Sequence, residues 1–585
     1  MRFLSEKYHK PRPYESRETL AITALLWYNP GMEKTVESSG LEQKIQSLEA
    51  IVESQAAQIA EMKTLLKYYE EQFKLSQRKQ FGSSSEQSPE QLRIEYMFNE
   101  AEDEADPAVA EPTYEEINYK RKKRIGKKQE DLEGLPVERI EYELPESERK
   151  CPDCGEVMRD IGVTVRDELE IIPAKVIHKE HAVHAYGCGK CEKKGGSAHI
   201  IRAQAPAPLI SGSLASPSAV AHIATQKFVN GMPLYRQEKG FGYDGVVLPR
   251  QNMANWLVNT AQNYMQAIYS LLIKSFLTED IGHADETSVQ VLREQGRAAQ
   301  SKSYEWLYRS GANSKRPVVI FEYKETRRQE HPREFLKDFK GFLHTDGYQV
   351  YHNLPPDIVI VGCWAHCRRY WEKAYEALDK NKRDGSSAER GLVYCNLLFA
   401  LEYDFLDLTP QERYEKRLAH SKPVSDDFFE WVGSLNAMPK FLIGEAIKYS
   451  LSQRKYLENV FLDGRLDLSN NLAERAIKPF VQGRKQWLFS CTPNGAESSS
   501  IYYSIVETAK ANNLNPFQYI KFLLEKLPSA KTADLASLLP WSESLPDDCR
   551  IPEKTSNVKP ELPKYLKGKG ALHNALQKLR EKYRN

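Results

Sequence analysis

The chain has 585 residues, of which 41% are hydrophobic and 28% charged, and its formal net charge is +1. This length exceeds what one hydrophobic core organises and predicts about two to four domains. Because the net charge is close to zero, the protein as a whole does not attract a polyanion electrostatically. Any nucleic-acid partner must therefore be held by local basic patches.

The first 40 residues carry no pattern that connects them with the rest of the chain, and Met32 is an alternative start. Their apolar stretch, residues 20–28, is short and lacks a cleavage site, so we expect no signal peptide. No run approaches the roughly 18 apolar residues that span a bilayer. Because the nine cysteines form no disulfide-rich cluster, we expect a cytoplasmic protein with no membrane partner.

A heptad repeat begins at Leu41 and runs to Phe73. Nine of its ten core positions are apolar, which fits a coiled coil of about five heptads. A long amphipathic helix packed on its own protein is the alternative. The polar flanks favour self-association, so we expect a homo-oligomer.

Residues 81–145 form a charged linker. An acidic block at 100–116 precedes a basic block at 118–128. Such blocks are usually solvated, but the basic block is equally suited to contact DNA phosphates.

Two C-x2-C pairs predict a zinc ribbon within residues 146–205. Four thiolates with strand-rich sequence between them suit a structural Zn²⁺ ion; they are Cys151, Cys154, Cys188 and Cys191. The 33 residues between the pairs exceed the usual spacing. Three intervening histidines are alternative ligands, although on strands they point to different faces: His178, His181 and His184. A redox site needs one C-x-x-C on a βα unit, which two separated pairs fit poorly.

Residues 206–275 have a helical pattern. Ser216 followed by Pro217 is a plausible helix start. A short helix, a glycine-containing turn and the segment LPRQNMANWL at 248–257 resemble a helix-turn-helix, whose second helix enters a major groove. A scaffolding helical hairpin is the alternative, and DNA contact is slightly favoured.

After residue 276 the hydrophobic period changes from helical to strand-like. Three predicted strands are followed by a helix, a strand that ends at Asp346, and a buried strand leading into a basic helix; the segments are 281–292, 301–310, 316–324, 331–341, 341–346 and 357–374. This is the order of an RNase H-like mixed sheet. The aromatic-rich, mostly helical residues 366–465 are predicted to be an insertion.

Two carboxylates are expected to meet on this sheet. Asp285 lies within the first strand and Asp346 at the end of the fourth, and these strands are neighbours in an RNase H-like fold. Converging carboxylates in apolar strands repel unless something pairs them, and divalent cations with oxygen ligands are the usual partner. Ordinary turn hydrogen bonding explains either residue alone, but explains the pair less well.

The third acid is expected on a helix laid against the sheet, in LSNNLAERAIKPF at 468–480. We predict a short helix that Ser469 or Asn470 caps and Pro479 ends. Its buried side is formed by Leu472, Ala476 and Ile477, and Glu474 projects elsewhere. The alternative is a Glu474–Lys478 ion pair, worth a few tenths of a kcal/mol.

Several motifs in fixed order resemble one family. HADETSVQV, LHTDGYQVY, GCWAHCRRYW, SNNLAERAIKPFVQGRKQWLFS and GAESSSIYYSIVETAKANNLNPFQYI look like segments of the DDE transposases of the insertion-sequence-sixty-six family. The zipper-like helix, the stretch RKQFGSSSEQ and the zinc ribbon also match its leader features. The resemblance covers roughly residues 41–530, and residues 1–40 and the tail after about 550 depart from it.

The resemblance implies a DNA transposase with Asp285, Asp346 and Glu474 as its catalytic, metal-binding triad. Two Mg²⁺ (or Mn²⁺) ions about 3.5–4 Å apart would activate water and then a 3′-hydroxyl, cutting at terminal inverted repeats and joining the element to target DNA. It also implies a bacterial, nucleoid-associated protein helped by accessory proteins of the element. A catalytically silent transposase-derived DNA-binding protein and an RNase H-like nuclease without strand transfer are the alternatives.

Basic and aromatic side chains around the third acid are candidate DNA contacts. They are Arg475, Lys478, Arg484, Lys485 and Trp487. The resemblance adds His366 of a C-x-x-H motif that begins at Cys363, and Arg368 nearby; the motif either positions DNA ends or is structural, and a second zinc there lacks a fourth ligand in the local sequence. For Leu488 and Phe489, the core of a strand is the favoured interpretation.

The predicted fold class is multidomain α/β, an RNase H-like mixed sheet with a helical insertion, preceded by coiled coil, zinc ribbon and helical DNA-binding region. The expected parts are a leader 1–40, coiled coil 41–80, linker 81–145, ribbon 146–205, helical region 206–275, catalytic core 276–365, insertion 366–465, second part of the core 466–530, and basic tail 531–585. From 551 on, the tail has nine bases and three acids, which suits a phosphate-binding arm.

Overall fold

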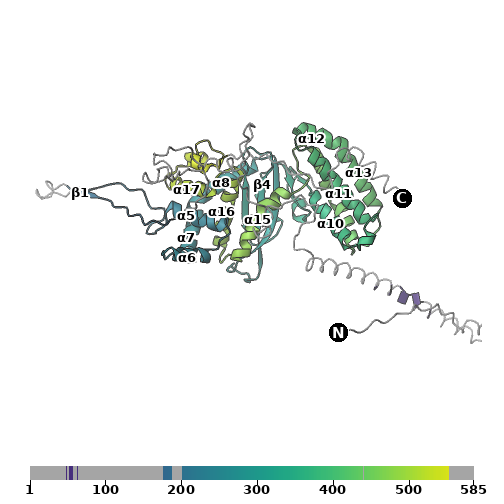
Figure 1. The fold of residues 1–585 in the computed structure, drawn as a ribbon, viewed down its shortest axis with the longest axis horizontal. Coiled ribbons are helices and arrows are strands. Elements are labelled where there is room, and N and C mark those ends of the chain that lie inside the picture. The colour runs from purple at the N-terminus through teal and green to yellow at the C-terminus, as the bar shows by residue number, and fades with distance from the viewer. Residues whose placement is uncertain are drawn as a thin grey trace, which may run out of the picture. The chain divides into compact units, whose positions relative to one another are not determined.

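The structure is a computed structural model that describes residues 200–438 and 440–552, residues 175–187, and scattered helical positions between 48 and 62 (Figure 1). The chain divides into two units, residues 1–82 and 83–585. The predictions for the leader, most of the coiled coil, the linker and the tail beyond 552 lie outside the described residues. So do the four ribbon cysteines: Cys151, Cys154, Cys188 and Cys191.

A five-stranded mixed sheet organises the second unit, in the order β5-β4-β3-β6-β7. The three strands β3, β4 and β5 are antiparallel, whereas β6 runs parallel to β3 and β7 parallel to β6. Their bounds are β3 Ile281–Gln290, β4 Lys302–Ser310, β5 Val319–Lys324, β6 Gly341–His344 and β7 Ile358–Val361. The predicted neighbourhood of the two acid-bearing strands is confirmed, because β6 pairs directly with β3. A separate two-stranded sheet pairs β1 Ala185–Gly187 with β2 Ile200–Arg202.

β6 is shorter than the strand that the sequence predicted, which ended at Asp346. It ends at His344, two residues before Asp346, because the Asp346 carboxylate accepts the backbone N–H of Tyr348 at 2.9 Å and bends the chain into a turn. A 3₁₀ helix, Gln349–Asn353, follows.

The edge strand β5 is covered by the long helix α16, Pro493–Ala511 (Figure 1). The hydroxyl of Thr508 accepts the N–H of Val319 at 3.0 Å, and the hydroxyl of Ser504 accepts that of Phe321 at 2.8 Å. Ser504 and Thr508 are four residues apart and therefore share one helix face. These hydroxyls satisfy edge N–H groups that would otherwise be open to pairing with another chain.

Most of residues 217–277 form helices, the secondary structure expected here. They are α5 Pro217–Phe228, α6 Leu234–Tyr243, α7 Arg250–Thr260, a π-helical turn Ala261–Met265, and α8 Gln266–Leu277. Ser216 caps α5 by accepting the N–H of Ala219. The candidate recognition helix α7 buries Met253 and Trp256 in the main hydrophobic core. Its first turn remains exposed and available for the DNA contact that the sequence suggested.

The predicted insertion is a helical bundle with its own hydrophobic core (Figure 1). Its helices are α10 Trp364–Ala377, α11 Ser387–Asp404, α12 Pro410–Lys416, α13 Lys422–Ser434 and α14 Leu442–Leu457. Buried aromatic side chains fill it, among them Trp364, Trp371, Tyr394, Phe428 and Phe429. No helix in the described part of the chain is long and apolar enough to cross a membrane.

The helix that carries Glu474 is longer than predicted. α15 runs from Asn471 to Trp487 and contains Pro479, so the expectation that this proline ends the helix is wrong. An interior proline costs about 3 kcal/mol. The buried side of α15, which includes Ala473, Ala476 and Phe480, offsets that cost by packing on β3 and β4.

The residues after α15 do not form the predicted core strand. Leu488 ends the helix with φ 67° and is 63% exposed, and Phe489 is also exposed. Only a single bridge joins Ser490 to Val291. The backbone reversal at Leu488 turns both apolar side chains away from the core.

Glu305 makes the stability of the fold depend on pH. It is 1% exposed on β4, and burial raises its pKa well above the usual range. The folded state therefore binds a proton that the unfolded chain releases, so this contribution is complete at low pH and is lost as the pH rises through the folded pKa.

We expect Glu305→Gln to raise the free energy of unfolding at pH 7, because the neutral amide is buried without the proton that the carboxyl has to bind on folding. Urea unfolding at several pH values measures the effect, which should shrink towards pH 4. Glu334→Gln, at a side chain that is 76% exposed, is the control. Equal stability of Glu305→Gln and the parent chain at pH 7 contradicts the prediction.

Candidate functional site

Asp285 lies in the middle of β3 and is half-buried. Burial raises its pKa well above the usual range, and the charges of Glu286, Asp346 and Glu474 raise it further. A hydrogen bond from the N–H of Glu286, 2.8 Å from Oδ1, opposes the shift. The predicted triad is therefore brought within electrostatic reach, from β3, the end of β6 and α15.

Asp346 lies level with Asp285 across the parallel strands. His283 pairs in register with His344, and each aspartate is two residues beyond its histidine. The two carboxylates therefore leave the sheet at the same edge, where β3 continues and β6 has just ended.

Glu474 lies in the first turn of α15. Its Oε2 accepts a hydrogen bond from Arg369 Nη2 at 2.7 Å, while Oε1 is buried without a hydrogen-bond partner and lies 3.7 Å from His366 Nδ1. Both partners come from α10. Glu474 of α15 therefore contacts two residues of another helix, α10. An ion pair with Lys478 on α15 itself does not account for these contacts.

Asn470 fixes the position of that helix. Its side chain is 1% exposed; the amide nitrogen donates to the carbonyl of Ala284 at 2.8 Å, and the oxygen is hydrogen-bonded to His283 Nδ1 at 3.0 Å. Its backbone N–H donates to Cys363 Sγ at 3.2 Å. Asn470 is the residue before α15, as predicted, but its side chain joins the helix to β3 beside Asp285 instead of capping it.

A buried histidine pair supports the same junction. The rings of His283 and His344 stack with centroids 4.3 Å apart, and Asp467 contacts both, through Oδ2 at 3.4 Å from His283 Nε2 and through its N–H at 3.3 Å from His344 Nε2. Burial lowers the pKa of His344 well below its usual range, so this ring is neutral. The repeated pattern His-x-Asp, at 283–285 and 344–346, was the sequence signal for this pair.

Glu286 is a fourth acid near the site that the sequence interpretation missed. Burial and the charge of Asp346 raise its pKa, while Tyr351 and Arg327 oppose the rise. It accepts hydrogen bonds from the Tyr351 hydroxyl at 2.5 Å and from the Arg327 guanidinium. That guanidinium lies 3.6 Å from the ring centroid of Tyr348, so Glu286 connects the turn after Asp346 to the sheet.

The four predicted basic contacts on α15 differ in their surroundings. Arg475 and Lys485 are exposed, and Lys478 is half-buried. Arg484 Nη1 donates to the hydroxyls of Thr287 at 3.1 Å and Ser288 at 3.3 Å, which places this cation two to three residues along β3 from Asp285.

Two further candidate contacts are already engaged within the protein. The Trp487 ring lies against Phe480, with centroids 5.6 Å apart, and under the Lys227 ammonium at 5.1 Å. Arg368 is buried and donates to Asn396 and Glu372. Trp487 is half-buried, so DNA contact by either residue stays a prediction, and the neighbouring Arg369 is the α10 cation that reaches Glu474.

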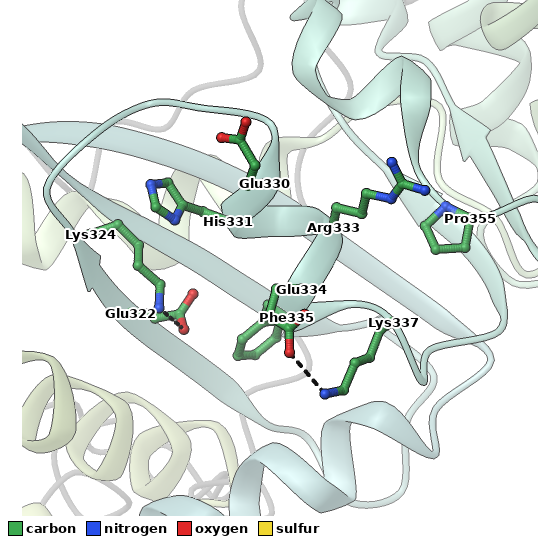
Figure 2. Close-up of a pocket in the computed structure, with 9 residues that line it drawn as sticks. All are labelled: Glu322, Lys324, Glu330, His331, Arg333, Glu334, Phe335, Lys337 and Pro355. Atoms are coloured by element: carbon green, nitrogen blue, oxygen red, sulfur yellow. Dashed lines mark hydrogen bonds and ion pairs between the residues drawn. The ribbon is translucent and has the colours of Figure 1, made fainter.

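A surface hollow of about 600 Å³ lies elsewhere, between β5 and the short helix α9, Glu330–Phe335 (Figure 2). Its lysines turn towards its own acids: Lys324 pairs with Glu322 at 2.9 Å and Lys337 with Glu334 at 2.8 Å (Figure 2). None of the three triad acids lines it. Acidic and basic side chains that line the hollow pair with each other, and the hollow is separate from the site of Asp285, Asp346 and Glu474.

Four protein-family models match the chain, and all belong to the same group of mobile elements. The model described as "Transposase IS66 family" matches residues 212–498, and "IS66 C-terminal element" matches 504–541. "Zinc-finger binding domain of transposase IS66" matches 148–192, and "Transposase C of IS166 homeodomain" matches 68–140.

Curated relatives from Sinorhizobium fredii (strain NBRC 101917 / NGR234) match most of the chain. "Uncharacterized protein y4qI" is 27% identical over 525 residues, which covers 84% of this chain and 93% of that protein. "Uncharacterized protein y4jD" is 27% identical over 428 residues, or 70% of this chain and 81% of the relative. Their names state no activity.

We expect Asn470→Ala to lower the free energy of unfolding by about 2–3 kcal/mol, because it leaves the Ala284 carbonyl and His283 buried without their partner. Urea unfolding measures the loss. Asn471→Ala changes the half-exposed neighbour and is the matched control. If the two variants are equally stable, Asn470 does not anchor α15.

Proposed function

The chain belongs to the IS66 transposase family, and we propose from this premise that it cuts DNA at the ends of its element and joins the released 3′-hydroxyl to target DNA. One observation carries the proposal: Asp285, Asp346 and Glu474, which are separated by 61 to 189 positions in the sequence, come together at one sheet edge. The strand order β5-β4-β3-β6-β7 supports an RNase H-like catalytic core.

The acids suit a divalent cation. The unpartnered Oε1 of Glu474 and the raised pKa of Asp285 are both relieved when a cation is shared among the carboxylates. Asp285, Asp346 and Glu474 would hold Mg²⁺ or Mn²⁺, hard ions that prefer oxygen ligands. When bound, such ions supply Lewis-acid polarisation of a phosphodiester and activation of water or a 3′-hydroxyl.

The protein's own side chains would orient the DNA. Arg484 is held by the hydroxyls of Thr287 and Ser288, two to three residues along β3 from Asp285. Arg475 and Lys485 extend the positive charge along exposed positions of α15. These cations suit phosphate groups on both sides of a scissile bond, contacts that set position without reading sequence. His366 is neutral at pH 7, because burial and Arg369 lower its pKa, so it would add a hydrogen-bonding group without adding charge.

The N-terminal segments complete the proposal. The zinc-finger model spans all four cysteines at 151, 154, 188 and 191, which supports a Zn²⁺ ribbon that contacts terminal repeats. The coiled coil would pair two copies so that both element ends are held together. We propose that the enzyme acts in the bacterial cytoplasm on the nucleoid, together with accessory proteins of its element.

A catalytically silent DNA-binding descendant is the second candidate. It requires the loss of at least one triad acid, whereas all three are present and converge. A nuclease without strand transfer would use the same three acids. Only the reaction products distinguish it from a transposase.

We expect Glu474→Gln to reduce cleavage and joining of terminal-repeat DNA by about 1,000-fold or more, while DNA binding is retained. Gel assays of cleavage and strand transfer with Mg²⁺ measure the two steps, and Glu497→Gln, at an exposed position of α16, is the control. Wild-type cleavage by Glu474→Gln overturns the triad. Cleavage without joining by the parent chain favours the nuclease, and binding without either favours the silent protein.

The Mg²⁺ requirement should rise as the pH falls. Because burial raises the pKa of Asp285, the metal-free carboxyl holds a proton that competes with the cation. The Mg²⁺ concentration for half-maximal cleavage should therefore decrease with increasing pH. Glu286→Gln removes one charge that raises this pKa and should shift the dependence to lower pH. A requirement that does not change with pH refutes this protonation of Asp285.

A further inference from the structure

Three side chains of different chemistry gather beside the acidic triad. Cys363 precedes α10, His366 lies in its first turn, and Glu474 lies in the first turn of α15. One ligand atom from each, Sγ, an imidazole nitrogen and a carboxylate oxygen, lies within 4.8 Å of the other two. The sequence contains the C-x-x-H pair but does not reveal the third group, which arrives from 108 positions beyond His366.

The distance between the nitrogen and the oxygen is close to that around a bound transition-metal ion, and the sulfur lies within 4.8 Å of both atoms. Ligand atoms at Zn–S, Zn–N and Zn–O bond lengths in a tetrahedron lie about 3.3–3.6 Å apart. His366 Nδ1 and Glu474 Oε1 are 3.7 Å apart. Both atoms are buried without a hydrogen-bond partner, so each has an unused lone pair or proton directed into the cluster.

Cys363 supplies the sulfur of the cluster. Cys363 is buried, and its Sγ accepts the backbone N–H of Asn470 at 3.2 Å. Backbone N–H donors stabilise a thiolate and orient it, which is the usual role of the groups that surround a metal ligand. The same Asn470 anchors α15 and so fixes Glu474 relative to Cys363.

We propose that Cys363, His366 and Glu474 bind a Zn²⁺-class ion through one sulfur, one nitrogen and one oxygen and leave a fourth coordination position open. This ligand set selects borderline-soft ions, whereas the three carboxylates of the triad select Mg²⁺ or Mn²⁺. Glu474 is common to both sets. The site goes beyond the proposed function, because it binds its ion whether or not the chain cuts DNA.

Arg369 competes with the ion. Its guanidinium donates to Glu474 Oε2 at 2.7 Å, and Nη1 lies 3.2 Å from His366 Nε2. An imidazole that binds a metal through Nδ1 carries its proton on Nε2 and cannot accept this second contact. Metal binding and the Arg369–His366 contact are therefore mutually exclusive, and Arg369 acts as the substitute cation of the metal-free state.

Cobalt titration of the full-length, metal-stripped chain tests the site without DNA. Co²⁺ bound to thiolate gives a charge-transfer band, and the parent chain should bind one more Co²⁺ per chain than Cys363→Ser or His366→Gln. Cys367→Ser is the matched control, because Cys367 is buried on the same helix with its Sγ against the Ser450 hydroxyl at 3.3 Å. Any Co²⁺ bound by the N-terminal cysteines is common to all four proteins and cancels.

Arg369→Gln provides a gain-of-binding measurement that misfolding cannot imitate. It should bind Co²⁺ more tightly at this site, because the guanidinium no longer occupies Glu474 Oε2 and His366 Nε2. Equal Co²⁺ stoichiometry in the parent chain, Cys363→Ser and His366→Gln overturns the proposal, as does unchanged affinity in Arg369→Gln. Strand-transfer assays fail or succeed independently of this result, so the two proposals are separable.

Discussion

The candidate site depends on one buried carboxamide. Asn470 donates to the carbonyl of Ala284 and is hydrogen-bonded to His283, so the start of α15 is fixed to β3 at the residue before Asp285. Without that link, no side-chain hydrogen bond would fix the start of α15 to the strand that carries Asp285, and Glu474 would be held by its contacts with α10 and by the packing of a helix that contains a proline. A hydrogen bond to a buried backbone carbonyl is directional and costly to leave unmade, and it therefore sets position more sharply than apolar contact does.

The rest of the fold positions both partners of this hydrogen bonding, strand β3 and the start of α15. Hydroxyls of α16 close the edge of β5, which leaves β3 in the middle of the sheet with neighbours on both sides. The helical insertion returns the chain to the same place: the N–H of Trp364 donates to the carbonyl of Leu468 at 3.0 Å. The insertion can therefore be long without displacing Glu474, because the residues on either side of it, Trp364 and Leu468, are hydrogen-bonded to each other.

Electrostatics explain why the site needs cations. Asp285, Asp346, Glu286 and Glu474 bring four carboxylates into one region. Arg327 and Arg369 neutralise two of them, and Asp285 responds to burial by a raised pKa. Arg369 contacts Glu474, which is also a candidate metal ligand. The Glu474 carboxylate is therefore an ion-pair partner of Arg369 in the metal-free protein and a candidate ligand when a cation is present.

The sequence by itself determined the strand-like segments between 281 and 361 and the helical insertion, because these follow from local hydrophobic patterns. The succession of these segments, which is that of an RNase H-like sheet, also predicted that the two strands carrying Asp285 and Asp346 are neighbours. It also carried the family motifs. Tertiary structure decided the rest: α15 continues through Pro479 because its apolar side is buried, Leu488 and Phe489 turn outward because of one positive φ, and Arg369 rather than Arg368 reaches Glu474. Neither the partner of Asn470 nor the third group beside Cys363 and His366 could be read from spacing, because each contact joins residues more than 100 positions apart, and only the packed core fixes which side chains then meet.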